Sequence, residues 1–286
     1  MPLSTARTVD DIQLGSFEFW ARPLDERHQA FAALRERCPI AFHPELAMLE
    51  GSPQGPGPGF WSVTRYEDVR TVSRHPNIFS SASGITMNEE QPELRDFFGS
   101  MIVLDDPRHA KMRLLVQRAF TPKTVQAIEQ SVRLRARRLV ADAAEQGGGD
   151  FVQLFAAPLP LQIICDMLGV PAEDEASVFD WTNVILGAGD PEFGGTYDAF
   201  ANAAMSMYAY AQELGQDRLD HPRDDLVTAL MHADVDGNRL TPAEFGSFFI
   251  LLAVAGNETT RNAISWGMKL LTDHPDQRRL WMEDVE

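Results

Sequence analysis

Cysteine is scarce in this sequence, with only Cys38 and Cys165 among 286 residues. Two cysteines exclude a disulfide framework and favour a reducing compartment. Basic residues are in the minority, 25 Lys and Arg against 42 Asp and Glu. The resulting net charge of −17 argues against nonspecific nucleic-acid binding. The most apolar run, 245–256, is shorter than the ~20 residues of a membrane-spanning helix, and the first 20 residues lack the apolar core of a signal peptide. We therefore expect a cytoplasmic protein with no membrane span.

Helical periodicity dominates what is present, and strand patterns are confined to the N-terminal part. A Gly- and Pro-rich stretch, GSPQGPGPG at 51–59, lies between the apolar segments AMLE and FWSV, which predicts a short hairpin. We find no internal repeat and no long linker, so we expect one domain over 1–286, mainly α with a small N-terminal β element. The expected helices cover 24–37, 66–73, 107–120, 122–146, 151–168, 173–186, 197–219 and 241–272.

The longest expected helix begins with a complete start signal. Thr241 is a good N-cap, Pro242 occupies the first helical position, and Glu244 completes a capping box. The pattern continues to about Thr272, and ~30 helical residues span about 45 Å, enough to cross a domain. Just before it, DVDGNR at 234–239 lacks the ligand spacing of a calcium loop, and we interpret it as a turn.

Small and polar residues interrupt the apolar character of this helix at its centre. Bulky side chains give way to Ala255, Gly256, Thr259 and Thr260, which lets a flat or bulky group lie against the backbone. Thr259 lies four residues after Ala255, so its hydroxyl can bond to that carbonyl and bend the helix. Glu258 adds a titratable proton to the same turn. The alternative interpretation is close helix packing with an exposed Glu-Thr pair.

Three segments, in the right order, resemble the cytochrome P450 family. AGNETT at 255–260 resembles its oxygen-activation motif, DDPRHAKMRLLVQRAFTPK at 105–123 its propionate-binding helix, and RHPNIFSSASG at 74–84 the entry to its substrate-covering loop. The resemblance implies a P450 fold and haem b (iron protoporphyrin IX) as cofactor. The stretch around AGNETT is most similar to bacterial members that hydroxylate steroid side chains or methyl-branched lipids, which implies a small hydrophobic substrate, dioxygen and two electrons from a partner.

The resemblance also implies roles for individual residues. His109 and Arg113 would bind the haem propionates, and their spacing of four on a helix places them on one face. Ala255 and Gly256 would make room for haem and oxygen. Glu258 would relay protons from bulk solvent and Thr259 would hold oxygen and a water, which makes these two the catalytic residues. The expected substrate contacts are Ile85 and Leu252.

Basic side chains gather between 107 and 138, where Glu129 is the one acid. In an acidic protein such a patch could dock an acidic electron donor of the ferredoxin type, whereas a solvated helix face is the simpler alternative. The basic patch comprises Arg108, Lys111, Arg113, Arg118, Lys123, Arg133, Arg135, Arg137 and Arg138.

The sequence departs from the family in two respects. The family's iron ligand is a cysteine thiolate in a glycine-containing loop, and Cys38 and Cys165 occur in unrelated contexts. No metal ligand is therefore assigned in this chain. The family's Glu-x-x-Arg pair is also missing, so we expect a C-terminally truncated, inactive member that lacks roughly its last third. The alternative is a non-enzymatic helical module that binds a hydrophobic ligand or partner.

Overall fold

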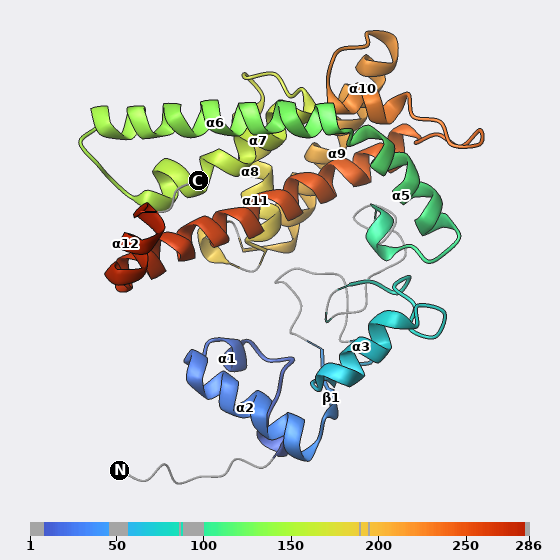
Figure 1. Cartoon of the computed structure of the whole chain (residues 1–286). Helices are drawn as coiled ribbons and strands as arrows, with labels where there is room; N and C mark the ends of the chain where they lie inside the picture. The colour runs from blue at the N-terminus through green and yellow to red at the C-terminus, as the bar shows by residue number, and fades with distance from the viewer. Residues whose placement is uncertain are drawn as a thin grey trace. The chain divides into compact units, whose positions relative to one another are not determined.

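The structure is a computed structural model that describes residues 9–45, 57–85, 87, 100–188, 190–193 and 195–283. The chain divides into two compact units, and each is described by itself. One comprises Met1–Ala110 with Gly195–Asp198, and the other comprises Lys111–Gly194 with Ala199–Glu286. Helices make up most of the described residues, which confirms the expected mainly α architecture (Figure 1).

The first unit contains the two described strands, which pair antiparallel. Strand β1, Ile40–His43, pairs with β2, Phe60–Val63, in a register that places Ile40 opposite Val63. The predicted strand FWSV is present, and its described partner is IAFH; the predicted partner segment AMLE, at 47–50, lies outside the described residues. The remaining elements of the unit are η1 (Val9–Asp11), α1 (Phe17–Trp20), α2 (Leu24–Arg37), α3 (Tyr66–Arg74) and η2 (Ser100–Val103).

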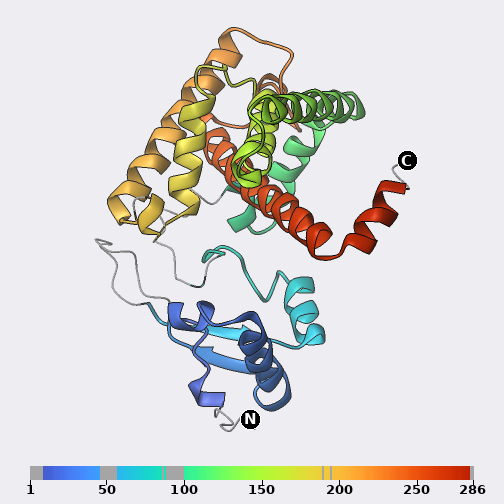
Figure 2. The same cartoon turned by 90° about the vertical axis from the view of Figure 1, so that its left-hand side faces the viewer.

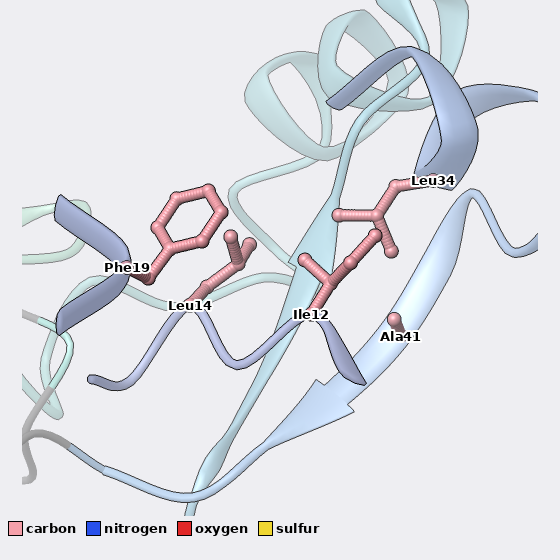
Figure 3. Close-up of a cluster of buried hydrophobic side chains, with 5 residues drawn as sticks. All are labelled: Ile12, Leu14, Phe19, Leu34 and Ala41. Atoms are coloured by element: carbon pink, nitrogen blue, oxygen red, sulfur yellow. The ribbon is translucent and has the colours of Figure 1, made fainter. Parts of the chain in front are cut away.

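A small apolar core holds the first unit together. The side chains of Ile12, Leu14, Phe19, Leu34 and Ala41 converge from the N-terminal segment, α1, α2 and β1 (Figure 3). Phe19 and Leu34 are fully buried. Burial of each such side chain stabilises the fold by about 1.5–3 kcal/mol, so this core fixes the strand pair against α2.

The second unit is a bundle of long helices around α11, Pro242–Asp273. Helix α7 contacts both α6 and α11, and α9 reaches the first turns of α11 (Figures 1 and 2). The N-terminal half of α11 packs into the core through four buried side chains, those of Phe245, Phe248, Phe249 and Ile250. The other helices are α5 (Arg108–Ala119), which begins at the end of the first unit, α6 (Pro122–Glu145), α7 (Pro158–Leu168), α8 (Glu175–Leu186), α9 (Tyr197–Asp220), α10 (Leu226–Met231) and α12 (Pro275–Glu283), with the short elements η3 (Val152–Ala156) and η4 (Pro191–Phe193).

The expected single helix over 151–168 is wrong in its first third. The chain forms a π-helix, η3, and the α-helix begins at Pro158. The amide of Ala157 donates to Val152 O, five residues earlier, at 2.8 Å. Proline has no N–H and clashes with a continuing helical turn before it, so the backbone widens there.

The predicted turn at 234–239 is confirmed. Val235 and Asn238 form an antiparallel bridge, and φ is positive at both Asp236 and Gly237, at 53° and 79°. Positive φ at both central residues is typical of a tight type I′ hairpin turn. The Asp234 carboxylate accepts from the Gly237 amide at 2.8 Å and fixes it.

Within the described part of the chain, no helix combines the length and the apolar character needed to cross a membrane.

Candidate functional site

Helix α11 begins as the sequence predicts. The Thr241 hydroxyl accepts from the Glu244 amide at 3.1 Å, and the Glu244 carboxylate accepts from the Thr241 amide at 3.0 Å. This reciprocal capping satisfies two amides that a helix start leaves without partners. The buried phenylalanines that follow anchor the helix, so its central residues sit on a rigid support.

The centre of α11 presents a face of small side chains to solvent. Ala255, Thr259 and Ala263 follow one another at helical spacing, and all three are exposed. The helix continues without interruption through 255–260. Thr259 Oγ1 donates to Ala255 O at 2.7 Å, which confirms the predicted bond. A carbonyl and a hydroxyl are therefore held side by side on a flat, accessible surface.

Gly256 lies toward a different helix. A Cβ built on it would lie 2.8 Å from Ile164 Cδ1 of α7. Real Cβ atoms do not approach so closely, so the missing side chain lets α11 pack against α7. Close helix packing, the alternative left open from the sequence, thus accounts for Gly256, and the expected role in making room for haem stays a prediction.

Glu258 lies at the border between the packed and the exposed faces of α11. Its Oε2 lies 3.5 Å from the guanidinium of Arg261, and Asn262 Nδ2 donates to its Oε1 at 2.9 Å. The Glu258 and Arg261 side chains keep 32% and 23% of their surface exposed. The acid is thus half-buried, oriented by two neighbours on its own helix, and next in sequence to the Thr259 hydroxyl.

Helix α5 carries the predicted anion-binding pair. His109 Nδ1 lies 2.8 Å from Met101 O, and because a carbonyl only accepts, this nitrogen carries the hydrogen. His109 therefore donates to an anion through Nε2 only when the ring is protonated. Arg113 is exposed. Spacing of four residues places both side chains on one face of α5.

The two predicted substrate contacts belong to different units. Ile85 lies in the first unit with 57% of its surface exposed, and Leu252 is half-buried on α11 in the second. Their joint role in substrate contact stays a prediction.

No family model matches the chain. A cytochrome P450 of Mycobacterium marinum, solved in complex with pseudoionone, is 38% identical, with a TM-score of 0.86 over 99% of this chain and 69% of that one. The chain belongs to the cytochrome P450 family. This confirms the resemblance carried by the three motifs. A second P450, from Chondromyces apiculatus, is 30% identical, with a TM-score of 0.76 over 97% of this chain.

Curated P450 relatives carry names of lipid and steroid hydroxylases. The methyl-branched lipid omega-hydroxylase of Mycobacterium tuberculosis is 50% identical over 281 residues. The steroid C26-monooxygenase of Rhodococcus jostii is 43% identical over 264 residues, 90% of this chain and 54% of that protein. The chain spans 65% of the length of the first of these relatives.

Neither cysteine of this P450 chain has the environment of an iron ligand. Cys165 is fully buried in α7, and burial raises the pKa of its thiol to about 12. Cys38 is half-buried and its thiol donates to Ile40 O at 3.4 Å. Metal-binding sulfur must be thiolate, so Cys165 serves as a small core residue, as its apolar context predicts. Among the described residues, no group of three or more His, Cys, Asp and Glu is placed to hold a metal ion.

The residues present are compatible in their chemistry with a haem group. The exposed face of Ala255, Thr259 and Ala263 offers a flat surface without bulky side chains. Arg113 offers an accessible planar guanidinium, whose fork of donors matches a carboxylate. These features suit a flat aromatic ring system with carboxylates at one edge.

The sequence analysis did not identify three polar residues that adjoin this site. Arg261 and Asn262 orient Glu258, and Asn257 is fully buried. Arg261 also lines a cavity of about 790 Å³ bounded by η3, α7, α8 and the η4 segment. Helical spacing of three and four from Glu258 was the available signal for the first two.

Proposed function

We propose that this chain provides the haem-edge contacts and the oxygen-side helix of a P450 monooxygenase that hydroxylates a lipid- or steroid-like substrate. The pairing of Thr259 with the Ala255 carbonyl on an exposed, small-residue face of α11, beside Glu258, is the observation that carries the proposal. The relatives named as methyl-branched lipid omega-hydroxylase and steroid C26-monooxygenase support the substrate class.

Haem would be held by His109 and Arg113 at its propionate edge and by the face around Ala255. Gly256 would contribute by letting α11 lie close to α7, which fixes where that face stands. When bound through the family's cysteine ligand, haem supplies the reductive activation of dioxygen. The ligand itself is not provided by Cys38 or Cys165, so the 286-residue chain alone would not sustain turnover.

Thr259 and Glu258 would divide the handling of protons between them. While the Thr259 hydroxyl donates to Ala255 O, its lone pairs remain free to accept from a water. Thr259 would thus fix a water on the small-residue face. Glu258, half-buried and next to it, would hold the proton to be delivered and recover another from solvent. Ile85 and Leu252 would contact the substrate.

An acidic electron donor of the ferredoxin type would bind the exposed cations of α5. Part of the basic patch is neutralised by ion pairs, with two distant acids at Arg135 and with the nearby Glu129 at Arg133. Arg135 pairs with Asp166 at 2.6 Å and with Glu175 at 3.3 Å. Arg133 pairs with Glu129 at 2.9 Å. Lys111 and Arg113 are exposed and, among described residues, form no ion pair. The proposed docking surface is therefore centred on α5 and not on α6.

A threonine-to-alanine comparison tests the proposal in a chimera that joins the iron-ligand region of the Mycobacterium tuberculosis relative to this chain. Thr259→Ala should keep the consumption of reducing equivalents and divert most of them from hydroxylated product to hydrogen peroxide. Thr260→Ala, at the adjacent exposed threonine, should retain the product yield of the unaltered chimera. An unchanged product yield in Thr259→Ala would remove Thr259 from this role.

A further inference from the structure

Asn257 is a buried amide without a partner in the described protein. Its side chain is 0% exposed, and neither Oδ1 nor Nδ2 has a hydrogen-bond partner among the described residues. An unpaired buried polar group costs a fold about 1–3 kcal/mol, and native structures pair nearly all such groups with protein or ordered water. The position therefore requires a partner that is small and polar.

A cavity lies one helical turn away. It has a volume of about 790 Å³, and Gln162 of α7, Asn183 of α8 and Arg261 of α11 are polar parts of its lining. Arg261 follows Asn257 by four residues and shares its face of α11. A cavity of this size with a polar lining holds water readily, since an internal water needs two to four polar partners and little volume.

Arg261 connects this cavity to the acid of the candidate site. Its guanidinium lies 3.5 Å from Glu258 Oε2 and also lines the cavity. The buried amide, the cavity wall and the carboxylate therefore occupy two consecutive turns of one helix. Asn257 and Arg261 lie on its packed side, and Glu258 lies at the border with the exposed face of Ala255 and Thr259.

We propose that Asn257 anchors an internal water continuous with this cavity, and that Arg261 is a positioning residue that holds Glu258 at the end of the hydrated path. A water in the path donates a proton to the Glu258 carboxylate and regains one from water in the cavity, which regains one in turn from bulk solvent, so the net result is one proton moved from solvent to Glu258. The use of the path for proton delivery rests on the proposed function. The water site itself does not.

Counting long-lived internal waters tests the site in the 286-residue chain. Oxygen-17 relaxation dispersion should show that Asn257→Leu, a change of similar volume, loses at least one long-lived water relative to the unaltered chain. Asn202→Leu, at an exposed helical asparagine of α9, should lose none. The melting temperature of Asn257→Leu should be unchanged or lower, because a hydrated amide is removed. A raised melting temperature with an unchanged water count would overturn the proposal, since it would mean that the amide was unpaired.

A variant-free measurement covers the case in which Asn257→Leu does not fold. A crystal structure of the unaltered chain should place an ordered water within hydrogen-bonding distance of Asn257 Oδ1 or Nδ2, and a protein group in that place would overturn the proposal. Neither measurement involves haem or turnover. Failure of the water site is therefore distinguishable from failure of the Thr259 experiment.

Discussion

Gly256→Ala tests how α11 is held against α7. The added Cβ would lie 2.8 Å from Ile164 Cδ1, 0.6 Å short of the 3.4 Å at which ordinary contacts begin. Ile164 is 6% exposed, so it has little room to move. Overpacking of this kind costs about 1–3 kcal/mol, while alanine gains about 1 kcal/mol over glycine in a helix. We therefore expect a net loss of up to about 2 kcal/mol in the free energy of unfolding.

A double-mutant cycle separates the clash from the propensity. Ile164→Val deletes the clashing Cδ1 and alone costs about 0.5–1.5 kcal/mol. In the double variant the alanine gain returns without the clash, so the two changes should be coupled favourably by the clash that is relieved, about 1–3 kcal/mol. Gly267→Ala is the control on the same helix, because nothing lies within 4 Å of its Cβ position, and it should stabilise by about 1 kcal/mol. Urea unfolding followed by circular dichroism measures all four variants. If Gly256→Ala stabilises as much as Gly267→Ala and shows no coupling to Ile164→Val, the packing role of Gly256 is refuted.

Two further predictions concern buried charge and buried histidine. Arg218→Met should lower the free energy of unfolding by about 3–5 kcal/mol, because Arg218 is 1% exposed and its loss leaves the buried Asp225 carboxylate, which lies 2.6 Å from Nε, without its cation. The control Arg133→Met removes an ion pair whose side chains are 69% and 63% exposed, and it should change the free energy of unfolding by less than about 1 kcal/mol. Equal effects of the two substitutions would contradict the assignment. Burial lowers the pKa of His43 from its ordinary value of 6.5, so the unfolded state binds the proton more readily and the first unit should lose stability as pH falls below about 6.5 toward the lowered pKa. Hydrogen exchange of the Leu14 amide, which donates to His43 Nδ1 at 3.4 Å, should report this loss of stability. His43→Gln should abolish the loss of stability at low pH. An unchanged loss in His43→Gln would assign the effect to another group.

Elements with strong local signals were predictable from the sequence. The capping box at Thr241 fixed the start of α11, and His274-Pro275 marked its end within a residue. Short elements were not predictable in this way. The strand Ile40–His43 has four residues, too few to establish an alternation, and helix α10 has six residues and was not predicted. In the uniformly apolar stretch 151–168, hydrophobicity hid the change from π-helix to α-helix, and only Pro158 signalled it.

The candidate site was predictable where it depends on contacts within one helix. The Thr259–Ala255 bond follows from a spacing of four. The use of Gly256 and the burial of Asn257 depend on which face of α11 lies against α7, and nothing in the local sequence gives that. The acids that neutralise Arg135 come from positions 31 and 40 residues away, so the basic patch looked larger in the sequence than it is.

Titration of haem into the 286-residue chain, followed by visible absorbance, tests most directly whether a porphyrin rests on the small-residue face of α11. We predict binding with one haem per chain, and at least about tenfold weaker binding, or about 1.4 kcal/mol, in Ala255→Phe, whose ring would cover that face. Ala209→Phe, at an exposed alanine of α9, should bind haem as the unaltered chain does. Equal affinity in Ala255→Phe and the unaltered chain, or no affinity in either, would contradict the account.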